Sequence, residues 1–208
     1  MTLTATPVHL AVYDTLADWE VGYATAHIDN PAWQRDPGRY RVVTVGETPD
    51  PVVTMGGMRI VPDVTVDAVD PAGSAMLILP GADVWLTGGN GAFADAARRF
   101  LDAGTPVAAI CGATGGLAAA GLLDDRRHTS NAREYLESTG YAGGHLYVDE
   151  PAVVDGPLIT ASSTAPVEFA RAVLDVLGVY EPATLASWYK LYGQRDPAGY
   201  FELMAATA

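Results

Sequence analysis

The chain has 208 residues, about half of them apolar, which is enough for one domain with a substantial core. It carries 12 Lys and Arg against 25 Asp and Glu, a net charge of −13, without a basic run, which argues against nucleic acid or an anionic membrane as a partner. A single cysteine excludes an internal disulfide and fits a reducing compartment. Because the sequence shows no signal-peptide pattern and no apolar stretch of membrane-spanning length, we expect a cytoplasmic protein.

The first predicted unit is a strand over residues 8–13, followed by a helix that ends near Asp29. Thr15, with Asp18 three residues later, is typical of a capping box at the start of that helix. Glu20 lies beside the apolar stripe of the helix and not opposite it. Two interpretations stay open: a rim glutamate that reaches solvent, which the pattern alone favours, and a partly buried carboxyl that is protonated or hydrogen-bonded.

The next part of the chain predicts further strands and one hairpin. The segments are a strand over 40–45, a hairpin around Gly56 and Gly57, a connector over 63–73, an apolar strand over 75–79 and a helix over 92–103. The two glycines between short apolar runs are a hairpin signal. Pro80 and Gly81 close the apolar strand, because proline and glycine both favour a turn.

The segment around Cys111 has the pattern of a nucleophile elbow. Residues 107–110 are apolar without polar alternation, as in a strand covered on both faces. Gly112 follows the cysteine, small residues continue for two turns, and Gly121 stands where a helix would end. Such a turn lifts one side chain toward a helix N-terminus, where a thiolate is favoured. The sequence therefore predicts that Cys111 ionises readily; a small, inert, buried cysteine is the alternative.

The rest of the chain continues the alternation of strands and helices. The segments are a polar turn and short strand within 122–130, a helix capped by Asn131 that ends near Glu137, strands near 147–148, 153–154 and 158–160, and a helix that opens at Pro166. This alternation predicts a mostly parallel sheet with helices on both faces. Residues 179–208 are expected to form an aromatic helical extension of the domain over residues 1–178, packed on that domain or on a second subunit.

An ordered set of motifs runs through these segments. They are Glu20 on the first helix, LILPG at 77–81, AAICG at 108–112, GLLD at 121–124, and DGPLITA at 155–161 before EFA at 168–170. Together they resemble the DJ-1/PfpI (ThiJ) family over about residues 8–177. The resemblance implies a flavodoxin-like three-layer α/β sandwich of the class I glutamine-amidotransferase-like superfamily, and a homodimer.

The resemblance also implies a set of site residues. Cys111 matches the reactive cysteine of the family, and Glu20 matches the carboxyl that hydrogen-bonds to the sulfur. Gly81 and Gly112 match the positions whose backbone N–H groups face the reacting oxygen.

The chain departs from the family's pattern at the histidine. Gly112 follows the cysteine where PfpI-type proteases have His, and Asn131 stands where DJ-1 has its His, so a Cys-His-acid triad is not evident. Asn131 and His128 are the auxiliary candidates, although His128 is expected on the opposite face of its strand. The four histidines and single cysteine have no metal-ligand spacing, and we expect neither a metal nor a cofactor.

The residues and the resemblance together predict a class of function and not a specific reaction. We expect a small-molecule enzyme, a hydrolase, hydratase or glyoxalase-like lyase, in which Cys111 adds to an electrophilic carbon and Glu20 handles the proton. The alternatives are a cysteine-based oxidative-stress sensor, a glutamine-amidotransferase-like protein without a complete triad, and an interaction module without activity.

Overall fold

The computed structural model describes residues 5–205 and contains a seven-stranded sheet. The strand order is β5 (Val64–Thr65), β2 (Tyr40–Gly46), β1 (Thr6–Ala11), β6 (Met76–Leu79), β7 (Val107–Ile110), β9 (Leu158–Ala161) and β8 (Ala152–Asp155). Neighbouring strands are parallel except for β8, which pairs antiparallel with β9. The expected mostly parallel sheet is confirmed.

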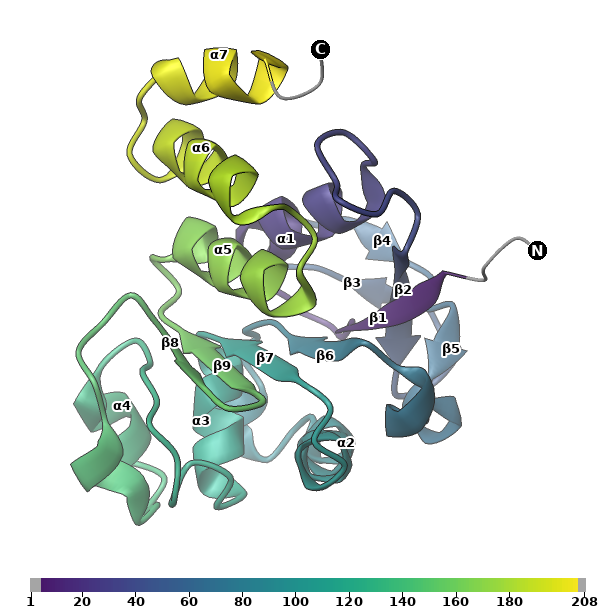
Figure 1. Ribbon diagram of the computed structural model, residues 1–208. Helices are drawn as coiled ribbons and strands as arrows, with labels where there is room; N and C mark the ends of the chain where they lie inside the picture. The colour runs from purple at the N-terminus through teal and green to yellow at the C-terminus, as the bar shows by residue number, and fades with distance from the viewer. Residues whose placement is uncertain (1–4, 206–208) are drawn as a thin grey trace.

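Helices cover both faces of the sheet (Figure 1). They are α1 (Asp18–Asp29), α2 (Gly91–Asp102), α3 (Gly112–Ala119), α4 (Arg133–Glu137), α5 (Pro166–Leu177), α6 (Pro182–Tyr192) and α7 (Ala198–Ala205). α1 and α5 pack together on one face, with α6 and α7 stacked outside them, and α2, α3 and α4 lie on the other face. The flavodoxin-like sandwich with C-terminal helices is therefore present.

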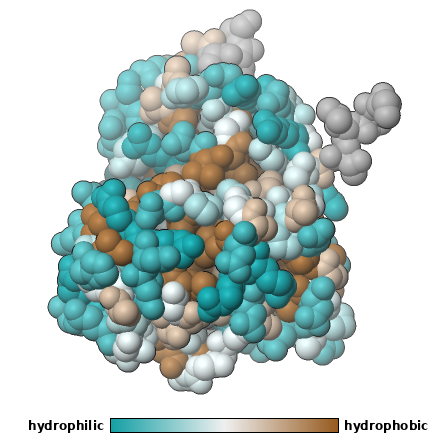
Figure 2. Space-filling view, turned by 60° about the horizontal axis from the view of Figure 1, so that its bottom comes forward, coloured by the Kyte–Doolittle hydropathy of each residue, from teal (hydrophilic) through white to brown (hydrophobic). Residues whose placement is uncertain are grey.

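The centre of the sheet is apolar because it is covered twice. Every residue of β6, β7 and β9 is buried, which explains runs such as Met76–Leu79 without polar alternation. The outer surface is largely polar, with hydrophobic areas between the polar ones on the face that Figure 2 shows. Among residues 5–205, no helix combines the length and apolar character needed to cross a bilayer.

The carboxyl ends of the central strands bring the site together. β1, β6 and β7 are adjacent and parallel, so the turns that follow them share one edge of the sheet. Pro80 and Gly81 follow β6, Cys111 follows β7, and the turn after β1 leads into α1, which carries Glu20. Glu20 and Gly81, which are 61 residues apart in sequence, thus meet Cys111 at one point, because the strands before them are neighbours.

Some local predictions were wrong at element ends. α1 has Ala17 as its N-cap with no side-chain cap bond, and Thr15 instead has a φ of 61° and accepts a hydrogen bond from the Asp83 N–H. The connector over 63–73 contains the edge strand β5 and two short 3-10 helices, Val66–Ala68 and Pro71–Gly73. The expected strand before Asn131 is only a single bridge between His128 and Tyr147.

The predicted hairpin is confirmed, between β3 (Val52–Val53) and β4 (Arg59–Ile60). Its turn is wider than two residues, because the Thr54 N–H donates to the Met58 carbonyl and leaves three residues in the loop. Gly57 in that loop has a φ of 83°, which favours glycine.

The C-terminal helices pack on the sandwich through α1. Trp188 of α6 is fully buried and its Nε1 donates to Nε2 of His27, 3.0 Å away. Nδ1 of His27 lies 2.7 Å from the hydroxyl of Tyr180. Trp188 and Tyr192 therefore pack against α1 and Tyr189 contacts α5, as expected of a buried aromatic extension. Tyr200 and Phe201 of α7 stay exposed, so for them the expectation was wrong.

Candidate active site

Cys111 occupies a strained turn between β7 and α3. Its backbone has φ 58° and ψ −123°, a conformation that costs a residue with a side chain on the order of 1–3 kcal/mol. Hydrogen bonding holds it there: its N–H donates to the Ala161 carbonyl of β9, and its own carbonyl accepts from Thr114. The predicted nucleophile elbow is the observed geometry, and it leaves the thiol half-buried and not sealed in the core.

The small residues of α3 make room for neighbours. A Cβ on Gly116 would lie 2.0 Å from the indole ring of Trp85, and one on Gly112 would lie 3.0 Å from the Ala82 carbonyl oxygen. The loop that follows β6 therefore packs directly on the elbow helix. This close approach explains why the helix after Cys111 is built from Gly and Ala.

Glu20 is completely buried beside the thiol, so the solvent-reaching interpretation was wrong. Its Oε2 accepts a hydrogen bond from the Gly81 N–H at 2.6 Å. Oε1 has no partner that meets hydrogen-bond geometry among residues 5–205, and the Cys111 thiol is the polar group beside it. Because Oε2 is already an acceptor, a proton on this carboxyl belongs on Oε1, facing the sulfur.

Gly81 has a different role from the one the resemblance implied. Its N–H binds Glu20, so it is not available to a reacting oxygen. A Cβ at this position would lie 2.9 Å from Cβ and Sγ of Cys111 and 2.9 Å from Oε1 of Glu20. Glycine is thus required for the carboxyl and the thiol to meet across the end of β6.

The electrostatics of the pair also differ from the prediction of a readily ionised thiol. Burial and then the negative charge of Glu20 raise the pKa of Cys111 to about 11, in opposition to hydrogen bonds from Asn131 and Gly112. Burial raises the pKa of Glu20 to about 7. The helix N-terminus does not outweigh these effects. A thiolate at neutral pH requires that its proton pass to Glu20, which then no longer repels it.

Asn131 completes the contacts of the sulfur and does not cap α4. Its Oδ1 accepts from the Ser163 N–H at 2.9 Å, which fixes the amide so that Nδ2 faces Sγ of Cys111 at 3.4 Å. The N-cap of α4 is Ala132 instead, with no side-chain bond. A hydrogen-bond donor therefore occupies the position where the resemblance places a histidine.

A pocket with a volume of about 250 Å³ opens onto the pair. It is lined by Ala17, Trp19, Glu20, Met55, Gly81, Ala82, Asp83, Leu86, Cys111, Gly112, Asn131 and Tyr135. None of these lining residues is Lys, Arg or His, and two are acidic. The pocket thus suits a small ligand without negative charge.

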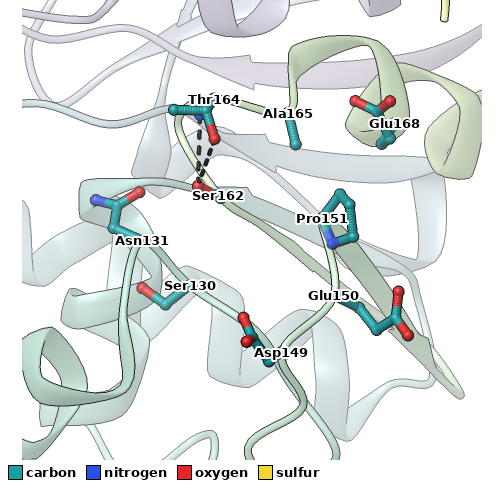
Figure 3. A pocket seen from close by; sticks show the side chains of 9 residues that line it. All are labelled: Ser130, Asn131, Asp149, Glu150, Pro151, Ser162, Thr164, Ala165 and Glu168. Atoms are coloured by element: carbon teal, nitrogen blue, oxygen red, sulfur yellow. Dashed lines mark hydrogen bonds between the residues drawn. The ribbon is translucent and has the colours of Figure 1, made fainter.

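A second, more polar cavity of about 400 Å³ adjoins the first at Asn131 (Figure 3). Asp149, Glu150 and Glu168 line it, together with Ser162 and small polar neighbours. Asn131 is the residue that lines both cavities. The thiol is therefore approached from the smaller, apolar pocket.

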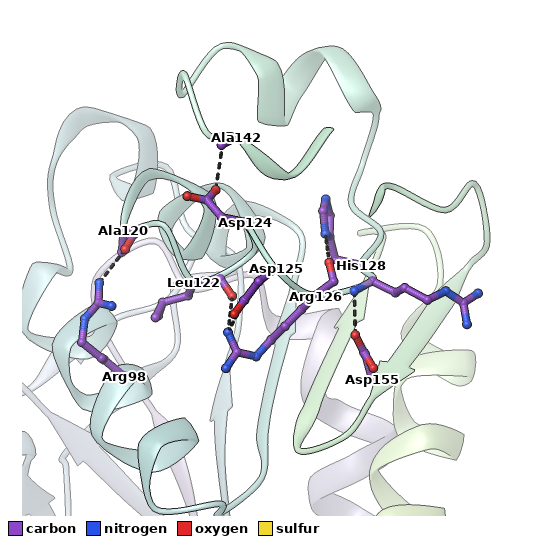
Figure 4. A network of polar contacts seen from close by, with 10 residues as sticks. Arg98, Ala120, Leu122, Asp124, Asp125, Arg126, His128, Ala142 and Asp155 are labelled. Carbon is purple, nitrogen blue, oxygen red and sulfur yellow. Dashed lines mark hydrogen bonds and ion pairs between the residues drawn. The ribbon is translucent and has the colours of Figure 1, made fainter. Parts of the chain in front are cut away.

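His128 does not take part in the site. Its Nδ1 lies 2.7 Å from the Arg126 carbonyl oxygen (Figure 4). Its Nε2 lies 3.0 Å from the Tyr141 hydroxyl, so both ring nitrogens are used. It is fully buried and does not line the pocket of Cys111. Within residues 5–205, no cluster of three or more His, Cys, Asp or Glu is placed to hold a metal ion.

No pattern in the sequence indicates the apolar wall of the pocket. Trp19, Met55, Leu86 and Tyr135 come from α1, the hairpin, the loop after β6 and α4, and only the tertiary fold brings them together. The Tyr135 hydroxyl donates to the Gly112 carbonyl at 3.2 Å, which ties α4 to the elbow.

The chain that forms this site belongs to the DJ-1/PfpI family. The family model matches residues 7–176. Among curated proteins, YoaZ of Bacillus subtilis, described as an uncharacterized protease, is 41% identical over 95% of both chains. YdeA of the same organism, also described as an uncharacterized protease, is 30% identical over 84% of each.

Solved structures agree with this assignment. A ThiJ/PfpI family protein from Bacillus anthracis superposes with a TM-score of 0.90 at 37% identity and covers 99% of both chains, including the C-terminal helices. The DJ-1 superfamily protein Atu0886 from Agrobacterium tumefaciens gives a TM-score of 0.80 at 32% identity, covering 91% of this chain and 99% of its own.

Proposed function

We propose that the protein is a cysteine-dependent enzyme that acts on small, uncharged carbonyl compounds, with α-oxoaldehydes as the substrate class. The observation that carries the proposal is the pair of Cys111 and Glu20, where Oε1 of Glu20, which has no other polar partner, lies beside the thiol at the base of a pocket. An unpaired, buried carboxylate oxygen is costly for folding, and such groups concentrate at functional sites.

The first step is addition of sulfur to the aldehyde carbon. The Sγ–C bond forms, the π electron pair of the carbonyl moves to its oxygen, and the thiol proton passes to Oε1 of Glu20. The N–H groups of Gly112 and Ala82 are the donors for the developing oxyanion. The Gly112 N–H bonds the sulfur before the reaction and is released from it when the sulfur binds carbon, unlike the Gly81 N–H, which stays on Glu20. The Ala82 N–H has no hydrogen-bond partner among the described residues.

The remaining steps need only proton transfers and water. Glu20 returns its proton to the oxyanion, which becomes a hydroxyl group. The C–H proton of the former aldehyde carbon then moves to the neighbouring ketone carbon and the hydroxyl proton moves to the ketone oxygen, which leaves a 2-hydroxy thioester on Cys111. Water then releases a 2-hydroxy acid and restores the thiol. The aldehyde carbon is oxidised as the ketone carbon is reduced, so no external oxidant is required.

The site favours this proposal over two other functions, proteolysis and oxidation sensing. Proteolysis, which the descriptions of YoaZ and YdeA suggest for those proteins, calls for a base that activates the cysteine, and no histidine lines the pocket of Cys111. Oxidation sensing calls for a thiol with a low pKa, and burial acts in the opposite direction here.

The test measures methylglyoxal consumption together with formation of its 2-hydroxy acid. We expect turnover by the wild type and its loss in Cys111→Ala and Glu20→Gln, whereas Glu202→Gln, a matched change in α7, retains it. Labelled casein and dilute peroxide followed by mass spectrometry are run in parallel. Cleavage of casein, or oxidation of Cys111 with no consumption of methylglyoxal, would refute the proposal.

We also propose a cytoplasmic homodimer. Trp19, Met55 and Met58 line one shallow hollow beside the site and are about half exposed. Val61, which follows β4 of the same hairpin, is 66% exposed. A second copy would remove this apolar surface from water. Light scattering tests the proposed dimer. We expect the wild type to be a dimer and Met58→Asp to be a monomer, and a monomeric wild type would contradict the proposal.

A further inference from the structure

One peptide group links the site to a buried pair of aromatic side chains. The Pro80–Gly81 peptide donates from the Gly81 N–H to Oε2 of Glu20 at 2.6 Å. At its other end, the Pro80 carbonyl accepts hydrogen bonds from the Tyr13 hydroxyl and from Nε1 of Trp85, the latter at 3.0 Å. The peptide group thus accepts two hydrogen bonds at its carbonyl and donates one to a carboxylate at its N–H. In such an arrangement each hydrogen bond strengthens the others.

The aromatic pair is held rigidly. Nε1 of Trp85 also lies 3.2 Å from the Tyr13 hydroxyl, and the two rings meet edge to face with centroids 5.7 Å apart. Phe93 also packs on Tyr13, with ring centroids 5.3 Å apart, and Gly116 lacks the Cβ that would collide with Trp85. Tyr13 and Trp85 are almost completely buried, so water does not replace either donor.

We propose that Tyr13 and Trp85 are positioning residues for Glu20, because their hydrogen bonds to the Pro80 carbonyl orient and polarise the peptide whose N–H holds the carboxylate. The inference rests on the proposed function only in assigning Glu20 as the acceptor of the thiol proton. Neither aromatic residue lines the pocket, so they touch no substrate.

The titratable groups around Glu20 determine which ionisation a pH profile of this site reflects. They are the Cys111 thiol, the hydroxyls of Tyr13 and Tyr135, and, in the same pocket, the carboxylate of Asp83. Burial raises the pKa of Tyr13 well above its ordinary value and that of Tyr135 to about 12, so both hydroxyls stay protonated between pH 5 and 9. Ionisation near neutral pH therefore belongs to the Glu20 and Cys111 pair.

The experiment is the pH profile of Cys111 alkylation by iodoacetamide, which needs no substrate. In Tyr13→Phe we expect the midpoint near neutral pH to move upward by a few tenths of a pH unit, because a less polarised Gly81 N–H stabilises the carboxylate less. Tyr40→Phe is the matched control: it removes a hydroxyl that donates to the Leu177 carbonyl at 2.9 Å, far from the pocket. It should leave the midpoint unchanged.

A folded Tyr13→Phe protein with the wild-type midpoint would overturn the inference. If Tyr13→Phe fails to fold, Trp85→Phe replaces it, with the same expected direction and the same overturning result. The variant Glu20→Gln separates the two proposals. If it keeps the wild-type midpoint, Glu20 does not accept the thiol proton, and the proposed function is refuted. That result would leave untouched the hydrogen bonds from Tyr13 and Trp85 through the Pro80–Gly81 peptide to Glu20.

Discussion

Helix α1 buries two titratable side chains, Glu20 and His27, and their surroundings differ in one respect. Both ring nitrogens of His27 are hydrogen-bonded, to Tyr180 and Trp188, in a closed aromatic cluster. Glu20 keeps one oxygen without a partner, beside a thiol and a pocket. Both side chains are buried, so burial alone does not distinguish a functional group from a structural one. What distinguishes Glu20 is an unpaired oxygen together with a thiol and a pocket beside it.

The largest effect is expected where the two reacting groups meet. In Gly81→Ala, the new methyl group would lie 2.9 Å from Sγ of Cys111 and from Oε1 of Glu20, and so would push them apart. Misplacement by about 1 Å costs on the order of 100-fold in turnover, which methylglyoxal consumption measures. Gly22→Ala in α1, where a Cβ meets nothing within 4 Å, is the control and should keep full activity. Turnover of Gly81→Ala within threefold of wild type would contradict this account.

Removing the charge of Glu20 should separate stability from activity. The pKa of this carboxyl is about 7 in the folded chain against an ordinary value of 4.5, so the folded state holds the proton more tightly and loses stability as the pH rises from 4.5 through 7. Above pH 7 the cost is about 3 kcal/mol. Glu20→Gln should therefore unfold at a higher temperature than wild type at pH 8 while it loses turnover.

Thermal stability and turnover must both be measured on Glu20→Gln, because only together do they separate the effect of the charge from the loss of activity. A glutamine can accept from the Gly81 N–H as the carboxylate does, so packing is conserved and calorimetry isolates the charge. At pH 4 the gain in stability should disappear, because wild-type Glu20 is then neutral in both states. A variant that is less stable than wild type at pH 8 would show that the carboxylate is well solvated, contrary to its burial.

The structural histidine should respond in the opposite direction. Trp188 donates to Nε2 of His27, so the ring is neutral with its proton on Nδ1, and burial lowers its pKa. A depressed pKa means that stability is lost as the pH falls below about 6.5, where the unfolded chain takes up the proton. His27→Phe should cost about 2 kcal/mol at pH 7.5, because it leaves the Trp188 N–H unpaired.

Calorimetry from pH 8 to pH 5 checks this contrast. The difference in stability between wild type and His27→Phe should shrink as the pH falls, because the wild type alone has a buried imidazole to protonate. Methylglyoxal turnover of the variant at pH 7.5 should remain, since His27 does not line the pocket of Cys111. A constant difference across this range would mean that His27 does not gain a proton on unfolding.

These contrasts mark what the sequence can predict. The elbow at Cys111 follows from residues within one short segment, a buried strand, glycine and small helical residues, and so it was predicted correctly. The state of Glu20 depends on Gly81, 61 residues away, and the apolar stripe of α1 does not report it. The direction of the Cys111 pKa shift was predicted wrongly for a similar reason, because the burial that raises it, and after burial the charge of Glu20, come from elements outside the elbow segment.

The smallest effect concerns Asn131, whose role was also hidden by distance. A polar residue before a helix is typical of a cap, but its partner here is the Ser163 N–H, 32 residues on, and its amide faces the sulfur instead. Asn131→Ala removes that donor and should slow alkylation of Cys111 by iodoacetamide at pH 7 by about fivefold, for a hydrogen bond worth about 1 kcal/mol.

Asn131→Asp separates donation from anchoring. The carboxylate can still accept from the Ser163 N–H, but it offers the sulfur a negative charge in place of an N–H group. Alkylation should therefore slow more in Asn131→Asp than in Asn131→Ala, although the aspartate is closer in shape to the native residue. If the two variants react equally fast, Asn131 only holds the loop, and the thiolate at this elbow depends on Glu20 and the backbone N–H groups alone.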